Sequence, residues 1–88
     1  MKIIRYAEAG TDGKEDLKVA IYPAAEGIEI LVNSTVKSLY GKLIEKSARE
    51  VLTALNVEAC RLEIDDRSAL DFAVRARVET AVRRGAEA

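Results

Sequence analysis

The stretch DDRSALDFAVRARVETAVRR, residues 65–84, predicts the turn from a strand into a helix on which the fold depends. Apolar residues at every fourth position are expected to form the buried side of this helix: Leu70, Val74, Val78 and Val82. Ser68, with Asp71 three residues later, is typical of a capping box, in which side chains bind the free backbone N–H groups of the first turn. Gly85 is expected to end the helix.

An extended segment precedes this helix, and a second helix precedes that segment. Cys60, Leu62 and Ile64 alternate with charged residues over positions 59–65, which is the pattern of a half-buried strand. Upstream, apolar residues recur at helical spacing over positions 36–55, so we expect a long amphipathic helix there.

The ends and the interior of this longer helix carry their own signals. Asn33, Ser34 or Thr35 can cap its start by accepting a hydrogen bond from a free backbone N–H. Asn56 suits the left-handed conformation that stops a helix. Gly41 inside the helix costs about 1 kcal/mol relative to Ala, so we expect a close packing contact at that position.

The first part of the chain is predicted to form strands. Residues 2–6 are expected to be a short first strand, followed by an exposed turn in TDGKED, residues 11–16. Apolar and polar residues then alternate over 17–22 and 28–32, which predicts a hairpin closed by a turn at 23–27. The complete order, β-β-β-α-β-α, indicates an α+β two-layer sandwich: a mostly antiparallel sheet of three to four strands with two helices on one face.

With 88 residues, the chain is expected to form one domain, residues 1–88. Its 14 Lys and Arg nearly balance its 15 Asp and Glu, so a formal net charge of −1 offers no overall attraction to nucleic acid or an anionic membrane. The single cysteine, Cys60, excludes an internal disulfide, and on an apolar strand face it is expected to be an inert buried thiol. No apolar run approaches the roughly 18 residues that cross a bilayer, and the first residues turn polar too early for a signal peptide. We therefore expect a cytoplasmic protein.

The residue types that carry most catalytic chemistry are missing. The chain has no His, no glycine-rich phosphate loop and no metal-ligand spacing, so we expect neither an enzyme nor a metal site. Asp65, Asp66 and Asp71 lie within seven residues of one another and could bind a hard cation. Carboxylates at a helix start are, however, favoured by its free N–H groups, so we interpret these three as helix-start or partner-contact residues.

Arginines accumulate along the predicted final helix. They form either a solvated face or a docking surface for a partner or for the phosphates of a cofactor: Arg75, Arg77, Arg83 and Arg84. Together with the acidic residues, the candidates for partner docking are Asp65, Asp66, Asp71, Arg75 and Arg77.

Three motifs carry a family resemblance: AGTDGKED at residues 9–16, VNSTVKSLYG at residues 32–41, and DDRSALD with the RAR-x-E pattern that follows it. Together they extend over almost the whole chain, which resembles the acyl-carrier (gamma) subunit of citrate lyase. The resemblance implies a non-catalytic subunit that carries acetyl and citryl groups as thioesters on a phosphoribosyl-dephospho-coenzyme A arm. It further implies that citrate lyase alpha- and beta-type subunits and a prosthetic-group transferase are its partners. A similar carrier occurs in malonate decarboxylase, but the DDRSALD and RAR motifs favour the citrate lyase branch.

The attachment residue departs from the family pattern. The family links its arm by a phosphodiester to a serine in the first loop, and the matching position here is Lys14, whose amine cannot form that bond. Thr11 is the fallback hydroxyl in the same loop. The resemblance therefore leaves two interpretations, an acyl carrier with an altered attachment residue and a non-acylated relative that acts as a scaffold or regulatory subunit. A lysine-linked lipoyl or biotinyl carrier lacks its usual flanking residues here, and an unrelated phosphate- or nucleotide-binding domain is the remaining alternative.

Overall fold

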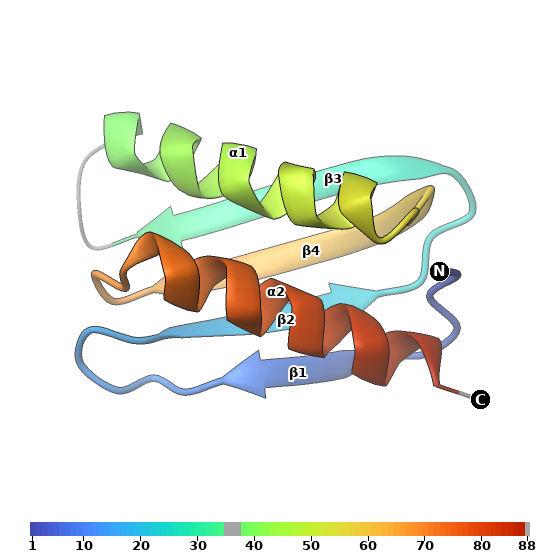
Figure 1. The fold of residues 1–88 in the computed structure, drawn as a ribbon, viewed down its shortest axis with the longest axis horizontal. Helices are drawn as coiled ribbons and strands as arrows, with labels where there is room; N and C mark the ends of the chain where they lie inside the picture. Colours follow the sequence, from blue (N-terminus) through green and yellow to red (C-terminus); the bar gives the residue numbers. More distant parts are fainter. Residues whose placement is uncertain (35–37, 88) are drawn as a thin grey trace.

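A sheet with both helices on one of its faces makes up the described part of the chain, residues 1–34 and 38–87 of a computed structural model (Figure 1). In chain order the elements are β1 (Ala7–Gly10), β2 (Leu17–Tyr22), β3 (Gly27–Ser34), α1 (Ser38–Ala54), β4 (Ala59–Asp66) and α2 (Asp71–Ala86). This order confirms the predicted α+β two-layer sandwich. Neither helix in the described ranges is long and apolar enough to span a membrane.

Within the described residues, the strands of the sheet lie in the order β1-β2-β4-β3. β4 separates β2 from β3: it pairs antiparallel with β2 and parallel with β3, so that Leu62 lies between Ile21 and Ile30. The predicted hairpin between residues 17–22 and 28–32 is therefore wrong, although both strands are located correctly. α1 carries the chain from the end of β3 back to the start of β4, which is the kind of crossover that a parallel pair requires.

The sheet begins later than the sequence predicts. Residues 2–6 stay outside the sheet, and β1 follows them and forms the hairpin with β2. Ile3 is buried in the core, and the backbone N–H groups of Ile4 and Arg5 donate to the Gly85 carbonyl oxygen at 2.9 and 3.2 Å. The first residues are thus bound to the last turn of α2 rather than to a neighbouring strand.

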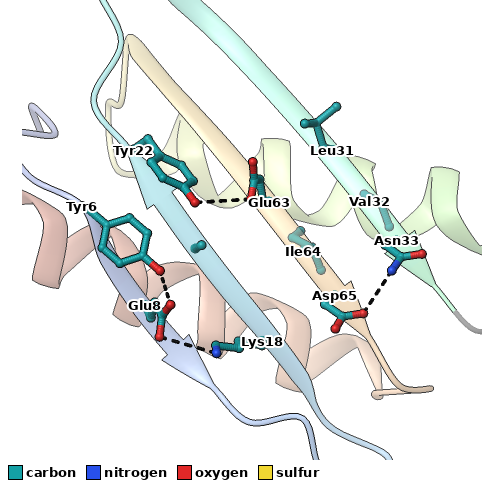
Figure 2. A pocket seen from close by; sticks show the side chains of 11 residues that line it. Tyr6, Glu8, Lys18, Tyr22, Leu31, Val32, Asn33, Glu63, Ile64 and Asp65 are labelled. Atoms are coloured by element: carbon teal, nitrogen blue, oxygen red, sulfur yellow. Dashed lines mark hydrogen bonds and ion pairs between the residues drawn. The ribbon is translucent and has the colours of Figure 1, made fainter.

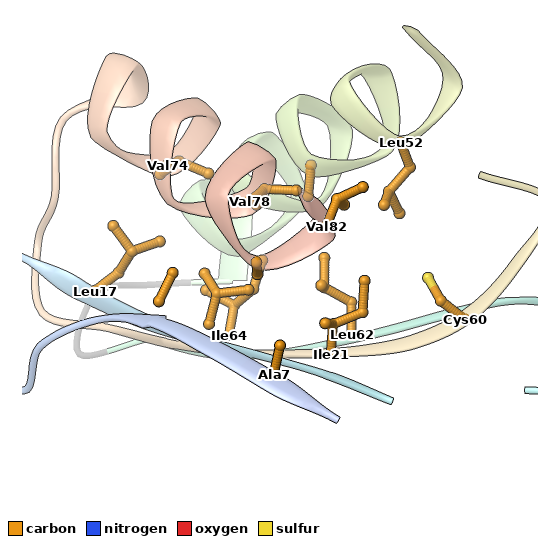
Figure 3. Packing of buried hydrophobic residues seen from close by; sticks show 14 of the residues in the cluster. Ala7, Leu17, Ile21, Leu52, Cys60, Leu62, Ile64, Val74, Val78 and Val82 are labelled. Carbon is orange, nitrogen blue, oxygen red and sulfur yellow. The ribbon is translucent and has the colours of Figure 1, made fainter. Parts of the chain in front are cut away.

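The core lies between the inner face of the sheet and the two helices (Figure 3). Alternating residues of β2 and β4 meet apolar residues of both helices there, among them Leu17, Ile21, Leu62, Ile64, Leu52, Val74, Val78 and Val82. Cys60 is buried in the same layer, as predicted, and its burial raises the pKa of the thiol. Leu70 is the exception on the predicted helix face, because it is 61% exposed and Ala69 is buried instead. The backbone at Leu70 is still extended, so helical spacing does not yet apply to it.

The predicted capping box of α2 is wrong. The helix begins at Asp71, and its N-cap is the extended residue Leu70, whose side chain makes no capping hydrogen bond. Ser68, the predicted cap, takes a left-handed backbone conformation with φ 66° in the turn before the helix. The predicted end of the helix at Gly85 is also wrong, because α2 continues through Gly85 to Ala86.

α1 starts and ends close to its predicted limits. Asn56 has φ 57° and lies just after the helix, as expected for a left-handed stop. Of the predicted caps, Asn33 and Ser34 belong to β3, and Thr35 lies outside the described residues. The predicted close contact at Gly41 is wrong, because a Cβ atom at this position would have no neighbour within 4 Å among the residues that the structure describes.

The two helical glycines are expected to respond in opposite directions to alanine. Gly41→Ala will raise the free energy of unfolding by about 0.5–1 kcal/mol, because alanine is the better helix former and the new methyl group would meet no described atom within 4 Å. Gly85→Ala will lower it, because its Cβ would lie 3.1 Å from Ile21 Cγ2 and 3.2 Å from the Arg5 carbonyl oxygen. Urea denaturation followed by circular dichroism measures both. A destabilised Gly41→Ala variant would contradict the open surroundings of Gly41.

Candidate functional site

The loop between β1 and β2, residues 11–16, is the candidate site because it is exposed and lies at the end of the molecule where α2 begins (Figure 1). Lys14 occupies the turn at its tip. Gly10 precedes the loop with φ 93°, and a Cβ atom there would lie only 1.9 Å from the Leu17 carbonyl oxygen. The backbone can therefore close the loop only with glycine at this position.

Asp16 fixes the base of the loop. Its carboxylate accepts hydrogen bonds from the Thr11 hydroxyl at 2.7 Å, the Leu17 backbone N–H at 2.7 Å and the Arg77 guanidinium at 2.9 and 3.3 Å. Because Arg77 belongs to α2, this ion pair ties the loop to the helical layer. The Thr11 hydroxyl, then the Leu17 N–H and Arg77, favour the ionised carboxylate and lower the pKa of Asp16 below its usual range. The Arg67 backbone N–H also donates to the Asp16 carbonyl oxygen, at 2.8 Å.

The two candidate attachment residues differ in their surroundings. Lys14 is exposed at the tip and presents an amine. Thr11 is also exposed, but its hydroxyl donates to Asp16 and accepts a hydrogen bond from the Gly13 N–H at 3.0 Å. The Thr11 hydroxyl therefore helps to define the conformation of the loop.

Asp71 and Arg75 form a second charged group, between the two helices. The Arg75 guanidinium donates to Asp71 at 2.8 Å and to Glu50 of α1 at 2.6 Å. The Ser47 hydroxyl of α1 donates to Asp71 at 2.5 Å and is the largest cause of the lowered pKa of that carboxyl. The hydrogen bond with Asp71 is likewise the main reason why the pKa of Arg75 is raised. Both side chains remain substantially exposed, so this group lies at the surface.

Asp65 and Asp66 are neighbours in sequence but lie on opposite faces of the sheet. Asp66 is fully buried and accepts hydrogen bonds from the Ser34 hydroxyl at 2.9 Å and from the Ser68 and Ala69 backbone N–H groups at 3.2 and 3.0 Å. It therefore stabilises the turn between β4 and α2 and does not present its carboxylate to a partner. Asp65 is partly exposed on the other face. Within residues 1–34 and 38–87, no group of three or more His, Cys, Asp or Glu side chains is placed to bind a metal ion.

Sequence reasoning missed Asp16, although this residue organises the loop. A local signal exists, because Thr11 and Asp16 stand at the two ends of a turn-rich segment. No local signal indicates that Arg77 is the partner of Asp16, because the two are separated by 61 positions and meet only through the packing of α2.

Comparison with known proteins finds similarity along nearly the whole chain. Residues 4–85 match a family model described as malonate decarboxylase delta subunit (MdcD). The chain is 47% identical over 88 residues to the citrate lyase acyl carrier protein of Escherichia fergusonii, covering 99% of this chain and 91% of the relative. It is 44% identical over 87 residues to that of Rhodopseudomonas palustris, covering 99% and 90%. A chain of a Pseudomonas malonate decarboxylase hetero-tetramer, solved in complex with malonate, shares the fold with a TM-score of 0.79 at 23% identity, covering 93% of this chain and 84% of that one.

Replacing Asp16 tests the base of the loop through its pH dependence. Asp16→Asn is expected to lower the free energy of unfolding by about 1 kcal/mol at neutral pH, because the bonds to the charged carboxylate are partly screened by water. The folded-state pKa of Asp16 is lowered, so its contribution is complete above the ordinary value of 3.8 and is lost as the pH falls through the folded value. Urea denaturation of the natural protein and of Asp16→Asn, repeated from neutral pH to pH values below 3.8, measures the free energy of unfolding of each. The difference between the two free energies is expected to become smaller in acid. Asp12→Asn, in the same exposed loop, is the control, and an equal loss in that variant would contradict the special position of Asp16.

The two neighbouring aspartates are expected to differ sharply in their effect on stability. Asp66→Ala will lower the free energy of unfolding by about 1–3 kcal/mol, because it removes the acceptor of the buried Ala69 backbone N–H in the β4–α2 turn. Asp65→Ala will change the free energy of unfolding by no more than about 0.5 kcal/mol, as is usual for an exposed side chain. Urea denaturation gives both values. Equal effects would mean that Asp66 does not stabilise the turn.

Proposed function

The chain belongs to the acyl-carrier family of citrate lyase and malonate decarboxylase, and on that premise we propose that it presents acetyl and citryl thioesters within a citrate-lyase-type complex. The observation that carries this proposal is the 47% and 44% identity to citrate lyase acyl carrier proteins over nearly the full chain. As a member of this family, the chain is a non-catalytic carrier subunit. In the proposed complex its partners are the alpha- and beta-type lyase subunits and a prosthetic-group transferase.

The β1–β2 loop is the part of the chain that we assign to presenting the acyl group. Its tip is exposed, so several active sites can approach it in turn. Its base is bound to α2 through Asp16 and Arg77, which restricts the direction in which the tip points. An exposed tip on a fixed base supports a role in delivering a tethered group.

Of the two candidate attachment residues in the loop, Thr11 fits the family's arm and Lys14 does not. The arm that the resemblance implies is linked by a phosphodiester to a hydroxyl, and it supplies the thiol that carries the acyl group. Lys14 has no hydroxyl, so position 14 does not fit this link. Thr11 has the only hydroxyl in residues 11–16 and is exposed, so we propose Thr11 as the attachment residue. Its hydroxyl would have to release Asp16 and the Gly13 N–H before it could be modified.

The first turns of α2 are the proposed contact region for the partner subunits around the loop. Arg77 touches the base of the loop, and Asp71 and Arg75 lie on the same helix at the same end of the sheet. A partner that approaches the tip would meet these side chains, and one that also covers the open sheet face would reach Asp65, which is partly exposed opposite Lys18 of β2. Asp66 contributes only indirectly, because it is buried and positions the start of α2.

Lys14 favours a second candidate function. A chain without a serine at position 14 can keep the carrier fold and serve the complex as a scaffold or regulatory subunit that is never acylated. The loading reaction separates this candidate from the first.

We expect the intact mass of the protein, co-expressed with a citrate-lyase-type prosthetic-group transferase, to increase by the mass of the arm. Fragmentation is expected to place the adduct on Thr11, and Thr11→Val to abolish it while Thr11→Ser retains it. A citrate lyase acyl carrier protein of known competence, loaded in the same cells, is the positive control.

The Lys14→Ser variant distinguishes the other outcomes. If only this variant gains the adduct, the natural chain is not loaded and the scaffold candidate is correct. If neither protein is modified while the positive control is, the transferase does not recognise this chain and the proposed carrier function is wrong.

A further inference from the structure

Two large apolar side chains stand exposed at the start of α2. Phe72 is 71% exposed and Leu70 is 61% exposed, more than any other large apolar side chain among the described residues. The neighbouring Ala69 and Val74 are buried in the core. Because a large apolar side chain stabilises a fold through its burial, Phe72 and Leu70 contribute little to the stability of this one.

Leu70 also occupies a position that local folding preferences would give to another residue. It is the N-cap of α2 and makes no capping hydrogen bond with its side chain. Serine, threonine, aspartate and asparagine are preferred at an N-cap because their side-chain oxygen accepts from a backbone N–H of the first turn. A residue that breaks such a rule is expected at functional or strained sites, and the extended backbone of Leu70, with φ −76° and ψ 157°, is not strained. The start of α2 is therefore a candidate surface for a partner.

The apolar surface continues onto α1. Tyr40 and Leu43 are 37% and 53% exposed and line a groove between the two helices, together with Asp71 and Val74 of α2. The Tyr40 hydroxyl donates to the Ala69 carbonyl oxygen at 3.2 Å, which holds the first turn of α1 beside the turn that precedes α2. We call the four exposed side chains the helix-start patch: Tyr40, Leu43, Leu70 and Phe72.

The helix-start patch adjoins the base of the β1–β2 loop, and the loop and the starts of both helices lie at the same end of the molecule (Figure 1). In the turn before α2, the Arg67 backbone N–H donates to the Asp16 carbonyl oxygen at 2.8 Å. The Asp16 carboxylate in turn accepts from Arg77 of α2 and from the Thr11 hydroxyl, at 2.9 and 2.7 Å. A protein that touches the Thr11 hydroxyl therefore also comes close to the start of α2.

We propose that the helix-start patch is the docking surface for the prosthetic-group transferase. The inference rests on the proposed carrier function and adds where this one partner binds. The transferase must bring its active site to bonding distance of a loop hydroxyl. Residues 11–16, three on each side of the tip, project at most about 10 Å from the body of the chain, so an enzyme that reaches them covers the neighbouring surface. Subunits that act on the acyl group meet it at the far end of the arm and need not come as close.

The attraction of this surface comes from apolar burial rather than from charge. The charged groups beside the patch are already paired, because Arg75 donates to both Asp71 and Glu50. Aromatic side chains are enriched at the centre of protein interfaces, where a few buried anchors supply most of the binding free energy. Phe72 stands on a helix, so little conformational freedom is lost when a partner covers it.

The open sheet face, which carries no helix, provides the control surface. Its polar side chains bind one another, and both Tyr6 and Lys18 contact Glu8 (Figure 2). Leu31 of β3 lies on this face and is 42% exposed (Figure 2). Leu31→Ser therefore removes an exposed leucine, as Leu70→Ser does, and leaves the helix-start patch intact.

The test measures binding of the unmodified full chain to a purified citrate-lyase-type prosthetic-group transferase by isothermal titration calorimetry. Phe72→Ala and Leu70→Ser are each expected to weaken binding by about tenfold or more, and Leu31→Ser to bind like the natural protein. Urea denaturation separates this loss from unfolding. Leu70→Ser is expected to raise the urea midpoint, because serine can cap α2, and Phe72→Ala not to lower it, because alanine is the better helix former.

The inference is wrong if Phe72→Ala and Leu70→Ser bind like the natural protein, or if Leu31→Ser weakens binding as much as they do. It is also wrong if the natural protein self-associates in sedimentation and Phe72→Ala abolishes the association, because a second copy then covers the patch. Absence of binding by the natural protein would overturn the proposed carrier function as well. Binding without loading would overturn only the attachment at Thr11 and leave the docking surface in place.

Discussion

The buried carboxylate of Asp66 sets the path of the chain from β4 into α2, and much of the structure depends on that path. Three hydrogen bonds, from Ser34, Ser68 and Ala69, occupy the carboxylate where water cannot enter. They join the end of β3, the end of β4 and the turn before α2 at one point. Since a buried charge is stable only when such donors surround it, this corner has little freedom to change its geometry.

Two interactions of α2 follow from that fixed start. Arg77 meets Asp16 at the base of the β1–β2 loop, and Arg75 links Asp71 to Glu50 of α1. The first fixes the loop relative to the helical layer, and the second joins the two helices. The Arg75 pairs are exposed, so their value lies more in orientation than in stability, whereas Asp16 is only 19% exposed beside Arg77. The helical layer thus determines where the loop tip is presented, while the opposite sheet face carries no helix.

The elements of the fold could be predicted from the sequence, but several of their contacts could not. Alternation located β2, β3 and β4, and helical spacing located α1 and α2, because both patterns report which side of a segment is buried. The same patterns do not identify a pairing partner, so the hairpin expected between β2 and β3 was wrong. In the candidate site, the exposed loop with Lys14 and Thr11 was recognised from its motif. Asp16 was missed because its main partner is on a distant helix.

The sequence by itself determined the class of fold and the family, because these depend on residue types, motifs and local periodicity. Tertiary structure decided the insertion of β4 between its neighbours, the burial of Asp66 beside a partly exposed Asp65, and the contact of Asp16 with Arg77. Each of these brings together segments far apart along the chain. Local sequence preferences do not predict such contacts, because their free energy comes from burial and hydrogen bonding that arise only when the layers pack.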